Sequence, residues 1–205
     1  MSRYRVFITI VITTLFLFGC NNVETRDARY KNTSKYDDPK YMPNKVDDTP
    51  PFGSKQDIDY AANLWQEMTK HKLVGVNSLR STPYEGIHPH GAILDTMQST
   101  LSLNRNVGDV IVKKNYGGEN ISKEAVADAP EQWLKAITVM YQRESGYDSD
   151  NKDWFWVKYA PDGSVLTNPK GMHLAGRVAK GMDQGCIACH TSAPGGDMVF
   201  NSDRE

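Results

Sequence analysis

The sequence predicts an α+β domain over residues 53–205, in which several β-strands follow one well-defined amphipathic helix. Three observations predict this class. One stretch repeats apolar residues at helical spacing, several short stretches are rich in β-branched or aromatic residues, and a turn-rich segment joins two of these as in an antiparallel hairpin. With 205 residues, the chain can form one domain with a sizeable core. It has no internal repeat and no set of four long amphipathic helices.

The helix is expected to begin beside Ser54 and to end near His71. Ser54 and Asp57 have the spacing of an N-terminal capping box, in which each side chain bonds the backbone N–H of the other residue. The apolar residues that then recur at helical spacing are Ile58, Ala61, Ala62, Trp65 and Met68. This stripe predicts a helix face that packs into the core.

Four later stretches carry strand signals. Residues 91–97 are a short apolar run, and residues 109–113 are rich in β-branched side chains. Residues 137–142 alternate between two faces, and residues 154–159 combine aromatic and β-branched side chains. The turn-rich segment 146–153 separates the last two, so we expect them to form an antiparallel hairpin.

A broken helix is expected between the second and third of these strands. Residues 122–135 are compatible with a helix, but Pro130 lies within them. Because proline lacks a backbone N–H and clashes with the preceding turn, it ends or kinks a helix. We therefore expect two short helical pieces.

The charge balance argues against nucleic acid as a partner. The chain has 24 basic and 25 acidic residues, for a formal net charge of −1. A nucleic-acid-binding surface needs a basic field, which this composition does not supply. Aromatic residues make up 10% of the chain, as in a globular protein that can cover a large flat cofactor.

Residues 1–19 are expected to be a lipoprotein signal peptide. Arg3 and Arg5 form a positively charged start, and residues 6–18 are apolar apart from three threonines. This run is short for a membrane span, which needs about 20 residues. It ends before Cys20, which we expect to carry the lipid after cleavage; the alternative is an uncleaved anchor helix. Both place the remaining chain in the periplasm, tethered to the inner or outer membrane.

Residues 20–52 are expected to be a flexible tether between the anchor and the domain. They are polar and charged, with four prolines and few aliphatic residues. Such a segment buries too little apolar surface to offset the entropy lost on ordering.

The chemistry is concentrated in Cys186-Ile187-Ala188-Cys189-His190, a C-x-x-C-H motif that is typical of covalent c-type haem attachment. In this reading the Cys186 and Cys189 thiols bond the haem vinyl groups as thioethers. His190 follows directly and can offer a ring nitrogen to the iron as the proximal ligand. The chain has three cysteines, so with Cys20 lipidated none remains for a structural disulfide.

Two other readings of the motif are weaker. A redox-active C-x-x-C normally follows a strand in a βαβ unit, which the surrounding sequence does not indicate. A structural zinc site needs four ligands, and the chain has no second cysteine pair.

The sequence does not identify the sixth ligand of the iron. Only fifteen residues follow His190, so the distal side is expected to come from the preceding sequence. Met198, in the tail, is too near the proximal side. The remaining candidates are His88, His90, Met172, His173 and Met182. If none binds, the iron keeps an open site for a small ligand.

Several stretches together resemble the cytochrome P-460 family. They are residues 136–141, 153–159, 161–163, 185–190 and 197–200, with weaker similarity around His90-Gly91 and Val110–Lys113. The resemblance covers roughly residues 55–202. It implies a mainly antiparallel β-sheet with a few helices packed around one c-type haem near the C-terminus, held by Cys186 and Cys189 with His190 as proximal ligand and often with no protein ligand on the distal side. The relatives that the resemblance implies include the gas-binding cytochromes c-prime-beta. It also implies a homodimer.

The resemblance leaves three functions to compare. The first is a lipid-anchored periplasmic cytochrome for single-electron transfer to a redox partner protein, for binding of nitric oxide or carbon monoxide, or for both. The second is oxidation of hydroxylamine or nitric oxide at an open haem, which in this family is aided by a lysine bonded to the porphyrin. No lysine lies between Asp95 and Gly108, where the resemblance places it. The third is a haem-based sensor.

Lysines and carboxylates elsewhere are expected to have ordinary surface roles. Lys113 and Lys114 lie on a predicted strand and are expected to face solvent. Asp95 and Glu144 are the candidate distal carboxylates, and surface positions are the simpler expectation for both.

Overall fold

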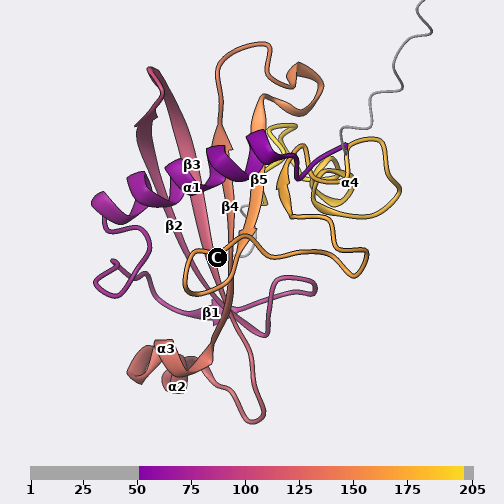
Figure 1. Cartoon of the computed structure of the whole chain (residues 1–205). Coiled ribbons are helices and arrows are strands. Elements are labelled where there is room, and N and C mark those ends of the chain that lie inside the picture. The colour runs from indigo at the N-terminus through magenta and orange to yellow at the C-terminus, as the bar shows by residue number, and fades with distance from the viewer. Residues whose placement is uncertain (1–50, 201–205) are drawn as a thin grey trace, which may run out of the picture. The chain divides into compact units, whose positions relative to one another are not determined.

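The computed structural model describes residues 51–200, which form one six-stranded sheet with helices around it (Figure 1). Each strand pairs antiparallel with the next in chain order. The strands are β1 (Tyr84–Glu85), β2 (Ile93–Leu103), β3 (Asn106–Tyr116), β4 (Leu134–Gln142), β5 (Trp154–Tyr159) and β6 (Ala175–Gly176). This confirms the α+β class and the mainly antiparallel sheet. The expected signal peptide, Cys20 and nearly all of the expected tether lie outside the described residues.

Helix α1 (Lys55–Lys70) begins at the predicted capping box and covers one face of the sheet (Figure 1). Ser54 Oγ accepts the N–H of Asp57 at 3.1 Å, and Asp57 Oδ2 accepts the N–H of Ser54 at 3.1 Å. The Tyr159 hydroxyl donates to the carbonyl of Ala61 at 2.7 Å and thereby ties β5 to the helix. The predicted helix and its N-terminal cap are confirmed.

Strands β2 and β3 form a longer hairpin than their strand signals predicted. The turn consists of Asn104 and Arg105, both in the left-handed region with φ of 52° and 68°. Such a two-residue turn matches the natural twist of paired strands. Gly108 lets β3 approach β4 closely, because a Cβ there would lie 1.8 Å from the carbonyl oxygen of Gln142.

The connection from β3 to β4 contains the broken helix that Pro130 predicted. Its two pieces are α2 (Lys123–Asp128) and α3 (Pro130–Trp133). The next connection, residues 143–153, contains a short 3₁₀ helix at Ser149–Asn151 and joins β4 to β5 as an antiparallel hairpin. The predicted hairpin is therefore confirmed.

The two faces of the sheet bury different partners because side chains alternate along a strand. Val112, Val139 and Val157 are in register on neighbouring strands and pack in one cluster with α1. Their chain neighbours Ile111, Met140 and Trp156 are also in register with one another, and they pack in a second cluster on the other face. That cluster includes Ile187 of α4 (Cys186–His190), which carries the C-x-x-C-H motif.

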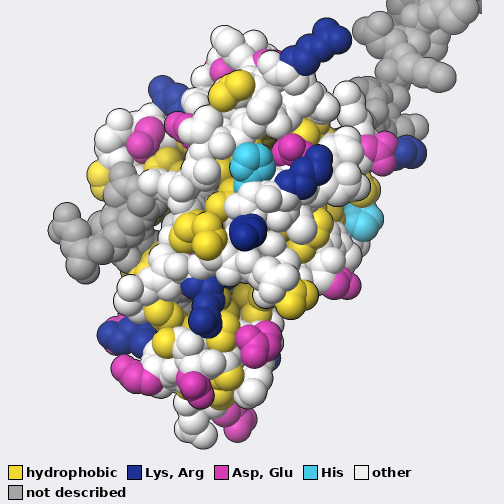
Figure 2. Space-filling model, turned by 90° about the vertical axis from the view of Figure 1, so that its left-hand side faces the viewer, with side chains coloured by type: hydrophobic (Ala, Val, Ile, Leu, Met, Phe, Trp, Pro, Cys, Tyr) yellow, Lys and Arg dark blue, Asp and Glu magenta, His cyan; other side chains and the backbone are white. Residues whose placement is uncertain are grey.

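The surface is mixed in charge. Figure 2 shows basic and acidic side chains interspersed around hydrophobic ones on one face of the molecule, without a patch of a single sign. This distribution agrees with the formal net charge of −1. Within residues 51–200, no helix is long and apolar enough to cross a membrane.

Candidate haem-binding site

Helix α4 holds the motif against the sheet. Gly185 precedes it with φ of +128°, and a Cβ at this position would lie 2.3 Å from Cβ of Ala179. Glycine is therefore required for this close approach. Ile187, inside the motif, is 4% exposed and packs in the cluster beneath the helix. The spacer residue thus anchors the motif while the flanking residues border a cavity.

His190 is buried and fixed in orientation. Its Nδ1 lies 2.7 Å from the carbonyl oxygen of Met198. Because a carbonyl can only accept, Nδ1 carries the proton and Nε2 carries the lone pair. The rings of Trp156 and Phe200 lie with centroids 4.7 Å and 5.3 Å from the imidazole, both close to edge-on. The ring is thus held in the tautomer that binds a metal through Nε2.

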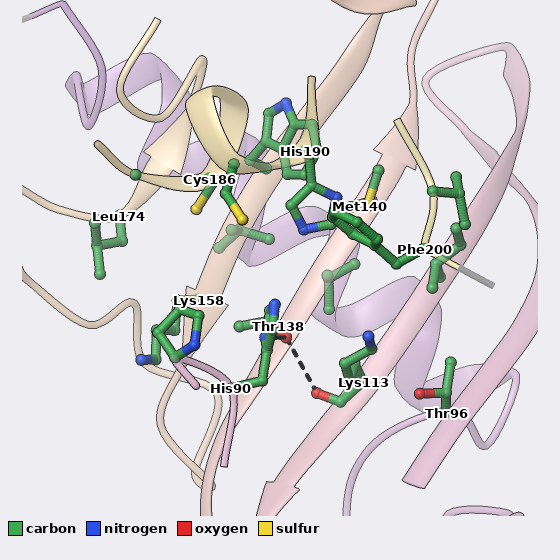
Figure 3. Close-up of a pocket in the computed structure, with 18 residues that line it drawn as sticks. His90, Thr96, Lys113, Thr138, Met140, Lys158, Leu174, Cys186, His190 and Phe200 are labelled. Atoms are coloured by element: carbon green, nitrogen blue, oxygen red, sulfur yellow. Dashed lines mark hydrogen bonds between the residues drawn. The ribbon is translucent and has the colours of Figure 1, made fainter. Parts of the chain in front are cut away.

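A cavity of about 270 Å³ separates α4 from the sheet (Figure 3). Its floor comes from β3, β4 and β5, and its walls come from the loop before β2 and from the C-terminal segment. The lining residues are Pro89, His90, Thr96, Ile111, Lys113, Thr138, Val139, Met140, Trp156, Val157, Lys158, Leu174, Gly185, Cys186, Cys189, His190, Val199 and Phe200. Most of them are apolar, so the cavity is suited to a largely hydrophobic cofactor.

The two motif thiols border the cavity as free cysteines. Cys186 is partly buried and Cys189 is exposed. Burial raises the pKa of the Cys186 thiol to about 11, and the positive charge of Lys158 opposes this only in part. A redox-active cysteine needs a lowered pKa, because the thiolate is the reactive form. The raised pKa therefore disfavours the reading of the motif as a redox pair.

The residues at this cavity fit a haem. Two thiols lie at one side, an imidazole with its lone pair on Nε2 lies above, and the sheet supplies an apolar floor. A zinc site is not supported, because residues 51–200 contain no group of three or more His, Cys, Asp or Glu side chains able to hold a metal ion. The predicted ligand His190 and the predicted attachment residues Cys186 and Cys189 therefore share one site.

The structure distinguishes among the candidate sixth ligands of the iron. His90 lines the cavity, whereas His88 and Met182 are exposed. Met172 and His173 are half-buried in the segment before β6 and do not line it. Met198 lies on the His190 side, where its carbonyl holds the imidazole, as its position in the sequence suggested.

Two expectations about lysines and one about a carboxylate were wrong. Lys113 lines the cavity and is half-buried, although we expected it to face solvent. Lys114 points to the opposite face of β3 and is 4% exposed, and Asp95 is 1% exposed. The two form a buried ion pair at 3.9 Å, which compensates for the burial of both charges. Glu144 is exposed, as expected, and pairs with Arg143.

Several residues of the site have no signal in the sequence. Thr138 and Lys158 are in register with Lys113 on neighbouring strands, and all three side chains line the cavity (Figure 3). Trp156 was expected only as a strand residue, yet it flanks His190. The alternation of β5 could have placed Trp156 and Lys158 on one face, but not opposite the motif.

Comparison with known proteins supports haem binding at this site. The family model described as Cytochrome P460 matches residues 78–201, which include the cavity and the whole C-x-x-C-H motif. No curated protein and no solved structure shows significant similarity to the chain. The matched region is more than half of the chain, and its family consists of haem-binding cytochromes. The chain therefore belongs to the cytochrome P460 family.

Proposed function

We propose that the chain is a membrane-anchored periplasmic c-type cytochrome with one covalent haem, which serves single-electron transfer, binding of a small diatomic ligand, or both. The observation that carries the proposal is the apolar cavity bordered by Cys186, Cys189 and the fixed imidazole of His190. Haem bound there supplies one-electron redox chemistry and an iron site for small ligands.

The two cysteines would attach the haem. Each thiol adds across one vinyl double bond, so that sulfur bonds one carbon and hydrogen is transferred to the other; no oxidant is consumed. The two-residue spacer, held by buried Ile187, keeps both thiols on one side of the cavity. Attachment therefore requires that both thiols stay reduced until the haem arrives.

The remaining residues would tune the iron. The Met198 carbonyl accepts from His190 Nδ1, which raises the basicity of the ligating nitrogen. Ile111, Met140 and Trp156 exclude water from the floor of the cavity. A dry environment disfavours the more highly charged oxidation state of the site, so these residues influence the reduction potential.

The membrane anchor is proposed from the N-terminal sequence. The motif around Cys20 is typical of lipid attachment, and covalent haem attachment to c-type apoproteins takes place outside the cytoplasmic membrane. The two motifs support one compartment, the periplasm. A physiological redox partner, and a homodimer as the family resemblance implies, belong to the same proposal.

The three cysteines provide matched variants for a test. In cells that export the full chain with haem-attachment machinery, Cys186→Ala should weaken or abolish the covalent haem signal on a haem-stained denaturing gel. Cys20→Ala should keep the haem but leave the membrane fraction or remain an unprocessed precursor. Full covalent haem in Cys186→Ala would overturn the attachment site, and normal lipid labelling of Cys20→Ala would overturn the anchor.

A second candidate function is oxidation of hydroxylamine or nitric oxide, favoured by the position of Lys113 in the cavity. Family resemblance implies that such chemistry accompanies a bond between a lysine and the porphyrin. A peptide joining Lys113 to the haem, found after digestion and lost in Lys113→Arg, would support this function. Haem attached through the two cysteines alone would favour electron transfer or ligand binding.

A further inference from the structure

A second imidazole lies opposite His190 across the cavity. His90, in the loop between β1 and β2, lines the cavity, and its ring centroid is 6.1 Å from that of His190. The two ring planes are nearly perpendicular, at 84°. Figure 3 shows one ring above the other, with the Cys186 sulfur beside the space between them.

This separation is the one that a shared metal ion requires. A metal–imidazole bond is about 2.0–2.1 Å long and each ring nitrogen lies about 1.1 Å from the ring centre, so two axial imidazoles have centroids about 6.2–6.4 Å apart. A histidine that only hydrogen-bonds an iron-bound ligand stands about 2.8 Å further away, which gives a centroid separation of roughly 9 Å. The observed 6.1 Å matches direct ligation by both rings.

The hydrogen bonds of both histidines favour the same tautomer. Thr138 Oγ1 lies 3.4 Å from the carbonyl oxygen of Lys113, to which it donates. Its oxygen is then available to accept from His90 Nδ1, at 3.3 Å. With the Thr138 hydroxyl donating to that carbonyl, Nδ1 of His90 carries the proton and Nε2 carries the lone pair. This is the tautomer of His190, where the acceptor is the Met198 carbonyl. Two separate elements therefore carry imidazole rings whose centroids are as far apart as those of two axial ligands.

We propose that His90 is the sixth ligand of the haem iron. The inference rests on the proposed function only in that haem must be bound beside His190. It deepens that function, because an iron with two imidazole ligands has no open position. The site is then suited to single-electron transfer, with small-molecule binding possible only after His90 dissociates.

The test is a set of optical and electron paramagnetic resonance spectra of the full-length haem-loaded protein. The wild type should be six-coordinate and low-spin in both oxidation states, and ferrous carbon monoxide binding should be slow or absent. Because the ring planes are perpendicular, the ferric resonance should be dominated by one feature at large g. The wild-type spectra need no variant, so this part of the test does not depend on whether a substituted protein folds.

Variants then identify the ligand. His90→Ala should become high-spin, should bind carbon monoxide readily, and should return to low-spin when free imidazole is added. His88→Ala is the matched control, because His88 is exposed two residues away in the same loop. It should leave the spectra unchanged. Haem content, measured alongside, should be the same in all three proteins.

Each other outcome overturns a defined part of the account. A high-spin wild type that binds carbon monoxide at once, with haem content intact, refutes His90 as ligand and leaves the proposed function standing. A low-spin spectrum that persists in His90→Ala without imidazole assigns the sixth position to another side chain. Absence of covalent haem from the wild type refutes the proposed function itself.

Discussion

Asp95 and Lys114 form a buried ion pair, and replacing either residue should destabilise the fold. Asp95 Oδ1 accepts from the backbone N–H and the hydroxyl of Ser81, at 3.0 and 2.8 Å. Lys114 Nζ lies 3.9 Å from Asp95 Oδ2 and donates to the Leu79 carbonyl at 2.7 Å and to Ser78 Oγ at 3.0 Å. The pair thus fastens the segment after α1 to β2 and β3.

The expected size of the effect follows from the burial. Lys114→Met keeps the length of the side chain but leaves the Asp95 carboxylate buried without its cation. Removing one member of a buried pair costs about 3–5 kcal/mol, a large part of the roughly 5–15 kcal/mol that stabilises a domain. Asp95→Asn keeps the acceptor for Ser81 but leaves the ammonium group unpaired. The double variant removes both charges and should cost less than the sum, by about 0.5–3 kcal/mol.

Urea unfolding followed by circular dichroism measures these free energies, with haem content matched among the proteins. Lys55→Met is the control, because Lys55 pairs with Asp59 on the surface and both side chains are exposed. Loss of such a pair costs about 1 kcal/mol or less. The reasoning is wrong if Lys114→Met costs no more than the control, or if the two buried substitutions are simply additive.

Three further predictions concern stability. Ser54→Ala removes the capping box of α1 and should lower the free energy of unfolding by about 1 kcal/mol; no change in urea midpoint would contradict it. Tyr159→Phe removes the hydrogen bond to Ala61 and should cost about 0.5–1.5 kcal/mol, whereas an unchanged midpoint would show that this bond adds nothing. Burial raises the pKa of the Tyr116 and Tyr159 phenols above 10.0, so above this pH the unfolded chain releases protons that the folded chain keeps. Burial lowers the pKa of Lys114 from 10.5, so up to that pH this residue opposes the effect of the two tyrosines. Above pH 10.5 the free energy of unfolding should fall as pH rises, and an unchanged melting temperature there would contradict this.

The sequence predicted the elements whose signals are local. Strand β5 has the predicted bounds, 154–159, because aromatic and β-branched side chains fill it apart from Lys158. The break at Pro130 was predicted because it depends on one residue. Strands β2 and β3 extend further than predicted, because an Asn104-Arg105 turn lacks the glycine that usually marks such hairpins. Strands β1 and β6 have two residues each, too few for any periodicity.

The haem motif is local in sequence, but the rest of its cavity is not. Lys113 and Lys114 are neighbours, and alternation along β3 sends one to the cavity and the other to the core. Which side chain is buried depends on the partner Asp95, which reaches Lys114 only through the β2–β3 register. His90 was one of five equivalent candidates until the loop before β2 placed it opposite His190.

The central claim is that one haem is bonded to Cys186 and Cys189, and the mass of one peptide tests it most directly. Trypsin should release residues 181–204 as a single peptide that contains the whole motif, because no lysine or arginine lies within it before Arg204. In protein matured with haem-attachment machinery, this peptide should carry the added mass of one haem and no thiol open to alkylation. A peptide of unmodified mass with two alkylated cysteines would contradict the account.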